Sequence, residues 1–199
     1  RADLEYAITK KPDYVAISFV QKPEDIAEVR DFITAHTSHP IKIIAKIERP
    51  NAVERITDIA AAADGIMIAR GDLAVEVPYA EVPAISRHII RECRKMNKPV
   101  IVATQMLGSM VASEFPTRAE ITDVATTAYL RADSTMTSEE TTIGINPVNV
   151  IETMSSFSKK GVMNNEKKTR NFSTRRQYDM PSSCNQCWSR CYLFRARYS

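Results

Sequence analysis

Residues able to bind charge, metal or phosphate follow several short apolar runs of this 199-residue sequence. They are Ser18, Lys46 with Glu48, Arg70-Gly71-Asp72, Thr104-Gln105 and Ser138-Glu139-Glu140. Lys46 and Glu48 share one side of an extended chain, because side chains repeat every second residue in a strand. A surface ion pair is the plainer interpretation of a Lys-x-Glu sequence, but this pair emerges from an apolar run. Glu48 and Asp72 could share one hard divalent cation, Mg²⁺ or alternatively Mn²⁺.

The segment Arg70-Gly71-Asp72 offers a second kind of chemistry. Its backbone N–H groups lie where a strand turns toward a helix, and such groups can cradle a carboxylate or a phosphate. An ordinary strand-to-helix turn is the alternative. Thr104 could donate its hydroxyl to a substrate or bond to the backbone at a strand end. The histidines have no metal-site spacing and are interpreted as solvated or helix-face residues; they are His36, His39 and His88.

These side chains need a scaffold that alternates strands with helices. Strand-like runs occupy residues 14–19, 41–47, 65–70, 100–104 and, more weakly, 133–137. The first four are nearly continuous apolar or β-branched runs, typical of strands covered on both faces of a parallel sheet. Helical spacing follows within residues 23–33, 52–60, 82–98 and 118–130. We expect Asn51 to cap the second helix, and Thr117 with Glu120 to form a capping box on the last.

The repeat of strand and helix restricts the architecture to two classes of α/β fold. Strand starts near residues 14, 41, 65, 100 and 133 are 24 to 35 residues apart, which is one βα unit each. An open doubly wound sheet and a (β/α)₈ TIM barrel both fit. Neither a G-x-G-x-x-G after the first strand nor a G-x-x-x-x-G-K-[ST] is present, so the barrel is favoured. Five units are three short of closure, and we expect an incomplete barrel with an unpaired edge strand.

Composition places the chain among ordinary globular proteins. Hydrophobic residues make up 44% and charged residues 26%, which excludes wholesale disorder, collagen and a disulfide-stapled mini-protein. No apolar run is long enough for a membrane helix, and Arg1 to Glu5 has neither the basic start nor the apolar run of a signal peptide. We therefore expect a cytoplasmic protein without a membrane partner.

Charge divides the chain in two. Residues 1–158 hold 17 Lys+Arg and 22 Asp+Glu, a net −5, whereas residues 159–199 hold 10 and 2, a net +8. We interpret 1–158 as a partial barrel domain and 159–199 as an unrelated, irregular basic tail that is expected to be disordered. Out-of-frame or read-through translation is our hypothesis for this change in composition.

The tail contains two patterns with alternative interpretations. Cys184, Cys187 and Cys191 have a zinc-like spacing, but a structural zinc site needs four ligands, and the remaining cysteine, Cys93, lies in a predicted helix. Arginines interspersed with aromatic residues could bind nucleic acid nonspecifically. We expect no specific nucleic-acid partner.

Four ordered blocks resemble the pyruvate kinase family. Residues 43–48 (IIAKIE) are similar to its K-I-E segment, and residues 64–76 (DGIMIARGDLAVE) to its D-G-I-M-x-A-R-G-D-L-x-V-E signature. Residues 98–107 (KPVIVATQML) and 116–120 (PTRAE) match two further blocks in the same order. The resemblance covers about residues 3–155. It departs at Ala74, at Gly108 and in the eighth-strand segment 133–141.

The resemblance implies transfer of a phosphoryl group from phosphoenolpyruvate to ADP, with Mg²⁺ and usually K⁺. It implies that Glu48 and Asp72 bind Mg²⁺, that Lys46 stabilises the phosphoryl group, and that Thr104 lies near the carbon that is protonated. Ser18 matches a serine beside the pocket. The backbone of Arg70, Gly71 and Asp72 would hold the substrate carboxylate.

The resemblance also implies parts that this sequence does not contain. The segment matches the C-terminal five βα units of the barrel, whereas an arginine, the K⁺ ligands and a small cap domain belong to the family's earlier strands. The family commonly forms homo-oligomers. We therefore expect a truncated pyruvate kinase, with a noncatalytic remnant that binds Mg²⁺ or a full-length relative as the alternative.

Overall fold

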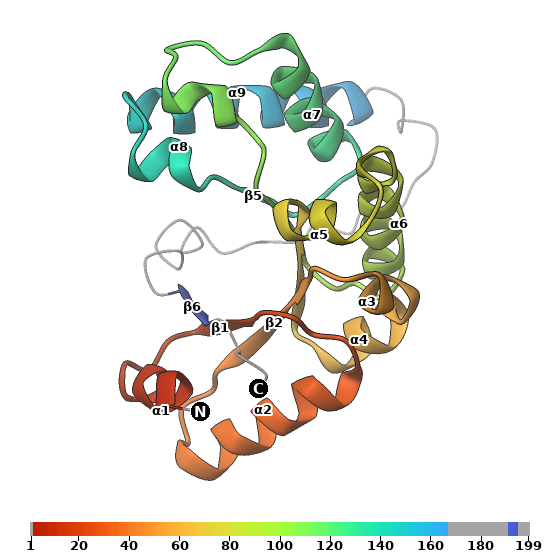
Figure 1. Ribbon diagram of the computed structural model, residues 1–199, viewed down its shortest axis with the longest axis vertical. Helices are drawn as coiled ribbons and strands as arrows, with labels where there is room; N and C mark the ends of the chain where they lie inside the picture. The colour runs from red at the N-terminus through yellow and green to blue at the C-terminus, as the bar shows by residue number, and fades with distance from the viewer. Residues whose placement is uncertain (1, 167–190, 195–199) are drawn as a thin grey trace.

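A single parallel sheet organises the chain in the computed structural model, which describes residues 2–166 and 191–194 (Figure 1). Its strands run in the order β5-β4-β3-β2-β1-β6. They are β1 (Tyr14–Ile17), β2 (Lys42–Ile47), β3 (Gly65–Ala69), β4 (Val100–Ala103), β5 (Ser134–Met136) and β6 (Cys191–Phe194). The five strands predicted from the apolar runs are thus confirmed.

The strand order distinguishes between the two candidate architectures. From β1 to β5 each strand pairs with the next one along the chain, always in parallel. A doubly wound sheet reverses its order at a switch point, whereas a barrel does not. The register also aligns the strand ends, since Ile17 pairs with Ala45 and Ile47 with Ile68. The carboxyl ends of β1 to β5 consequently share one rim of the sheet.

Helices connect and cover the strands, as expected for βα units. They are α1 (Ala2–Thr9), α2 (Pro23–His36), α3 (Pro50–Glu54), α4 (Ile56–Ala62), α5 (Arg70–Glu76), α6 (Val82–Lys95), α7 (Arg118–Tyr129), α8 (Glu139–Thr142) and α9 (Pro147–Glu166), with short 3-10 turns η1 (Tyr79–Glu81) and η2 (Gly108–Val111).

Two predicted helix caps have different outcomes. The capping box of α7 is confirmed: Thr117 Oγ1 accepts from the Glu120 N–H at 3.3 Å, and Glu120 Oε2 accepts from the Thr117 N–H at 2.7 Å. The predicted cap at Asn51 is wrong, because α3 already begins at Pro50 and Arg49 occupies the N-cap position. Proline is favoured at the first helical position, where its missing N–H costs no hydrogen bond.

Alternating side chains divide the buried residues between two faces of the sheet. The larger cluster includes Val15, Ile43 and Ile66 and packs beneath residues of helices such as Ile26 of α2 and Ile59 of α4. The smaller cluster lies on the opposite face and consists of Ala16, Ile44, Met67, Ile101 and Ala103. Because both faces are buried, near-continuous apolar strands were required.

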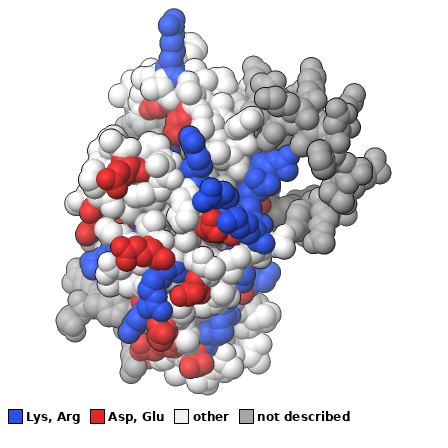
Figure 2. All heavy atoms as spheres, turned by 90° about the vertical axis from the view of Figure 1, so that its right-hand side faces the viewer, with Lys and Arg blue, Asp and Glu red and all other residues white. Residues whose placement is uncertain are grey.

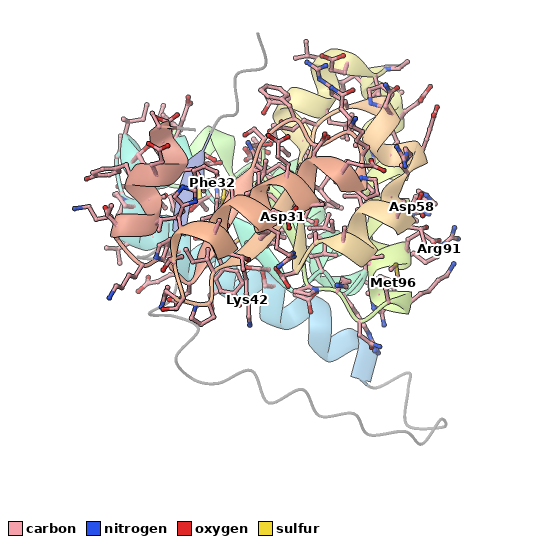
Figure 3. The ribbon with its side chains drawn as sticks, turned by 90° about the horizontal axis from the view of Figure 1, so that it is seen from below. Asp31, Phe32, Lys42, Asp58, Arg91 and Met96 are labelled. Atoms are coloured by element: carbon pink, nitrogen blue, oxygen red, sulfur yellow. The ribbon has the colours of Figure 1, made fainter. Side chains whose placement is uncertain are left out.

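The outer faces of the helices are charged. Seen from below, Asp58 of α4 and Arg91 of α6 point away from the body of the molecule (Figure 3), and their side chains are 63% and 67% exposed. On the face that carries α6, basic and acidic side chains lie next to one another (Figure 2). There Lys95 pairs with Glu92 at 2.9 Å.

Two aspartates bracket the amino ends of neighbouring strands. Asp64, just before β3, donates its N–H to the Ile43 carbonyl at 2.9 Å and accepts the Ile43 N–H on Oδ2 at 2.8 Å. Asp133, just before β5, bonds to Val100 of β4 in the same way, at 3.0 and 2.8 Å. Each aspartate therefore fixes the register of one strand pair at the rim opposite the carboxyl ends.

The structure corrects the expectation of an irregular tail after Ser158. Helix α9 continues through that position to Glu166, and residues Cys191–Phe194 form β6. Strand β6 pairs in parallel with β1, with Tyr14 opposite Cys191 and Ile17 opposite Phe194 (Figure 1). The edge of β1, which was expected to be unpaired, is therefore occupied by the chain's own C-terminal segment.

The remaining predictions for the tail concern residues outside the described ranges, including Cys184, Cys187 and the arginines before β6. Cys93, the only cysteine of the barrel segment, is fully buried in α6, and burial raises the pKa of its thiol to about 12. Such a thiol is a poor metal ligand, since the thiolate is the ligand form. Among the described residues no helix has the length and apolar character needed to cross a membrane.

Candidate functional site

Lys46 occupies the centre of a polar cluster at the carboxyl ends of β1 and β2. Its Nζ donates a hydrogen bond to Ser18 Oγ at 2.9 Å and lies 2.5 Å from Glu48 Oε1. Ser18 follows β1 directly and Glu48 follows β2, so the parallel pairing of these strands brings the three side chains together. The predicted proximity of Lys46, Glu48 and Ser18 is therefore present in the structure.

Both oxygens of the buried Glu48 carboxylate have a partner. Its side chain is 1% exposed, and Oε2 accepts the backbone N–H of Phe19 at 2.7 Å. The buried Oε1 forms the ion pair with Lys46 but accepts no aligned hydrogen bond. Phe19 has a left-handed backbone with φ of 59°, which directs its N–H toward the carboxylate. Oε1 thus faces the Lys46 ammonium without an aligned hydrogen bond and keeps lone pairs that a metal cation could share.

Asp72 lies on the same rim as Glu48. It is exposed in the first turn of α5, directly beyond β3, and β3 is the neighbour of β2 in the sheet. Within the described part of the chain no three His, Cys, Asp or Glu residues cluster as a metal site. A donor set of one or two carboxylates fits Mg²⁺, which commonly leaves its other positions to water and substrate oxygens.

Thr104 and Gly71 are joined across the ends of β4 and β3. The Gly71 N–H donates to Thr104 Oγ1 at 2.8 Å. An added Cβ on Gly71 would lie 3.4 Å from that oxygen, so the two segments approach closely. One amide of the predicted anion cradle is therefore already paired with the hydroxyl that was predicted to contact substrate.

The side chain of Arg70 turns away from this rim. It is 10% exposed, and its guanidinium donates to the carbonyls of Thr104 and Gln105 at 2.8 and 3.1 Å. Its Nη1 also pairs with Asp123 of α7 at 2.7 Å. Of the predicted substrate-binding segment 70–72, Arg70 can thus offer only its backbone to a ligand at the rim.

A family model described as "Pyruvate kinase, barrel domain" matches residues 1–151. The chain belongs to the pyruvate kinase family. The resemblance inferred from the four sequence blocks is thereby confirmed.

Pyruvate kinases of two bacteria match the same region. The pyruvate kinase of Methylorubrum extorquens is 48% identical over 154 residues, which cover 77% of this chain and 31% of that protein. The pyruvate kinase of Geobacillus stearothermophilus is 47% identical over 154 residues, which cover 77% of this chain and 26% of that protein. The chain thus spans about a quarter to a third of the length of these relatives.

A solved structure supports the fold of this pyruvate kinase segment. A crystal structure of a pyruvate kinase from Cryptosporidium parvum superposes with a TM-score of 0.78 at 37% sequence identity. The similarity covers 80% of this chain and 34% of that one. The α/β class with a parallel sheet agrees with the family's barrel domain.

The end of β5 adds a buried acid to the pyruvate kinase rim. Glu140 is 3% exposed and accepts the Ser138 N–H on Oε2 at 2.6 Å. Reading the strand ends pointed to the segment 138–140 but did not distinguish its two glutamates. Glu139 is exposed, whereas Glu140 closes the turn.

A cavity of about 290 Å³ lies behind the rim, between α6 and α7. Arg70, Gln105, Glu120 and Asp123 are among the residues that line it. Burial alone would raise the pKa of Glu120, but hydrogen bonds from Ser109 and Thr117 outweigh burial and lower it. Glu120 therefore ties the loop after β4 to the start of α7.

Sequence reasoning missed two contributors to this site. Phe19 donates its backbone N–H to Glu48, a role that the type of its side chain does not indicate. Asp123 holds Arg70 from the middle of α7, and its sequence neighbours Thr122 and Val124 give no signal for a buried ion pair. Both act through contacts between segments distant in sequence.

Proposed function

We propose that this chain is the part of a pyruvate kinase barrel that binds phosphoenolpyruvate and Mg²⁺, for phosphoryl transfer to ADP with pyruvate and ATP as products. The proposal includes the finer fold assignment, the C-terminal five βα units of an eight-unit barrel. One observation carries it: Lys46 contacts Ser18 and the buried Glu48 at the carboxyl rim, the same rim on which Gly71 bonds to Thr104. The family relation gives this cluster its chemical interpretation.

Lys46 supplies positive charge to the phosphoryl group in transfer. Its side chain is 12% exposed, and Ser18 and Glu48 fix its amine, so the amine needs little reorganisation when negative charge develops. Such fixed charge is the main contribution that a protein makes to phosphoryl transfer. Glu48 and Asp72 would hold Mg²⁺, and when bound this ion neutralises charge on the phosphoryl oxygens and orients the substrate.

Gly71 and Thr104 provide the binding site for the substrate carboxylate and the hydroxyl for proton delivery. The Gly71 N–H donates to Thr104 Oγ1 in the free chain. A bound carboxylate would replace that oxygen as the acceptor, and the Thr104 hydroxyl would then be free to face the methylene carbon. Once the phosphoryl group has left for ADP, the enolate takes a proton at that carbon and becomes pyruvate.

Pyruvate formation coupled to NADH oxidation by lactate dehydrogenase tests the proposal. We would assay the chain alone and with a fragment of the first three barrel strands of the Geobacillus stearothermophilus relative, which by resemblance carries the arginine and the K⁺ ligands. We expect Mg²⁺- and K⁺-dependent turnover with the fragment, and at least about a hundredfold loss in Lys46→Met.

Two outcomes would count against the proposal. Turnover that survives in Lys46→Met would overturn the role of the cluster. No turnover in either preparation, with Mg²⁺ binding retained, would favour the noncatalytic alternative.

A further inference from the structure

Thr104 and Gln105 form a strained pair of residues at the end of β4. Their φ values are 67° and 56°, in the left-handed region that favours glycine, and Thr104 is β-branched. Two consecutive residues of this kind persist only where surrounding contacts compensate for the strain. The question is which contacts hold this turn, because the turn sets the position of the Thr104 hydroxyl.

Arg70 binds the backbone carbonyls of the turn. Its Nη2 donates to the carbonyls of Thr104 and Gln105 at 2.8 and 3.1 Å, and its Nε lies 3.3 Å from the Thr104 carbonyl. The next residue, Gly71, donates its N–H to Thr104 Oγ1. Two adjacent residues of α5 therefore hold Thr104: Arg70 bonds to its carbonyl and Gly71 to its hydroxyl.

Asp123 fixes the guanidinium that performs this task. Its Oδ1 accepts a hydrogen bond from Arg70 Nη1 at 2.9 Å, its Oδ2 lies 2.7 Å from the same nitrogen, and the Arg70 side chain is only 10% exposed. Charge-assisted hydrogen bonds of this kind are about twice as strong as neutral ones. Without Asp123 the buried guanidinium would lack its only carboxylate partner among the described residues and would be drawn toward solvent.

We infer that Asp123 is a positioning residue for Thr104, acting through Arg70. Among the described residues, no hydrogen bond or ion pair joins Asp123 to the Lys46 cluster or to the Thr104 hydroxyl. Its effect on Thr104 therefore passes through Arg70 and the strained turn. The role of Asp123 in the reaction rests on the proposed function, whereas its effect on the Gly71–Thr104 hydrogen bond does not depend on that function.

Amide hydrogen exchange of the full chain, followed by NMR, tests this inference without requiring turnover. The reporter is the Gly71 N–H, and the reference is the N–H of Ile68 in the core strand β3. In Asp123→Ala we expect Gly71 to exchange at least about tenfold faster while Ile68 is unchanged. In Asp123→Asn, which keeps an oxygen acceptor but loses the charge, we expect the Gly71 N–H to exchange about threefold faster. Glu92→Ala removes an ion pair on the outer face of α6 and should change neither rate.

The outcomes separate this inference from the proposed function. Faster exchange at Gly71 alone supports it, and unchanged exchange in a folded Asp123→Ala overturns it even if pyruvate formation falls. If Asp123→Ala accelerates both amides through unfolding, Asp123→Asn decides by the same criterion. Where the complemented chain forms pyruvate, Asp123→Asn should lower kcat about threefold and leave the KM for ADP unchanged.

Discussion

Lys46 Nζ lies 2.5 Å from Oε1 of Glu48, whose side chain is 1% exposed. Replacing Lys46 by Met would leave that carboxylate buried without its counter-charge. Because removing one partner of a buried ion pair leaves an uncompensated charge, we expect the free energy of unfolding to fall by roughly 3 kcal/mol. Urea denaturation followed by circular dichroism measures the change.

A surface pair provides the matched control. Lys95 contacts Glu92 at a similar distance, 2.9 Å, but its side chain is 61% exposed. Lys95→Met should change stability little, because solvent screens exposed pairs. If Lys46→Met and Lys95→Met lowered the free energy of unfolding equally, the Lys46–Glu48 pair would contribute no more than a solvent-screened surface pair.

Glu48 and Asp72 should make thermal stability depend on Mg²⁺. A ligand that binds only the folded state raises the unfolding temperature by mass action. We expect millimolar Mg²⁺ to raise the Tm of the wild-type chain, and chelation with EDTA to reverse the rise. The rise should disappear in Glu48→Gln and in Asp72→Asn.

Asp58→Asn is the control for the metal experiment, since Asp58 is exposed on α4 and points away from the body (Figure 3). Its Mg²⁺ response should equal that of the wild type. A Tm shift that persists in Glu48→Gln would place the ion at another site.

Gly144 should not tolerate a side chain. A Cβ at this position would lie 2.1 Å from the Glu140 carbonyl oxygen, a backbone atom that can move only with the turn after α8. We expect Gly144→Ala to cost roughly 1–3 kcal/mol, whereas Gly108→Ala, whose Cβ would meet only Glu120 Oε1 at 3.8 Å, should cost little. Chemical denaturation of both variants checks this, and equal stabilities would contradict the turn geometry.

Glu120 should add a pH-dependent term to stability. Its pKa in the folded chain is lower than its ordinary value of 4.5, so its stabilisation is complete above that value and is lost as pH falls through the lower folded pKa. The stability difference between the wild type and Glu120→Gln should therefore shrink as the pH is lowered from 6 to 3. Glu114→Gln, at an exposed position in the preceding loop, is the control. A difference that stays constant with pH would argue against the hydrogen bonds from Ser109 and Thr117.

The pairing of β6 with β1 can be tested by cross-linking. Tyr14 lies opposite Cys191 in the register, and neighbouring strands are about 4.8 Å apart, within the range that a disulfide spans. We expect mild oxidation of Tyr14→Cys to join positions 14 and 191, as identified by peptide mass spectrometry. Tyr6→Cys, at an exposed site on α1, should form no such bond. Equal linkage of position 14 to Cys184, Cys187 and Cys191 would contradict the register.

The scaffold was readable from the sequence because its determinants are local. Continuous apolar runs predicted β1 to β5, and the spacing of Thr117 and Glu120 predicted the cap of α7. Lys46, Glu48 and Ser18 could be placed together because parallel neighbours align their carboxyl ends. The error at Asn51 was avoidable, since Pro50 carried the stronger local signal.

The other features depend on contacts that no local pattern encodes. The guanidinium of Arg70 meets Thr104 34 residues away and Asp123 53 residues away, so its turn away from the rim could not be predicted. The left-handed Phe19 and Thr104 occur without glycine, which removes the usual sequence marker. Strand β6 is an apolar run of four residues between Arg190 and Arg195, too short to predict a strand without its partner β1.

Asp64 and Asp133 hold their strand pairs at the end of the sheet farthest from the polar rim. The residues that stabilise the strand pairing and the residues proposed for the chemistry thus lie at opposite ends of the same strands. A family can consequently exchange residues at one end while the other preserves the architecture, and a variant that has lost all turnover can still melt like its parent. Thermal denaturation alone would therefore be a poor screen for damage at Thr104, and an intact melting curve should never be taken as proof of an intact enzyme.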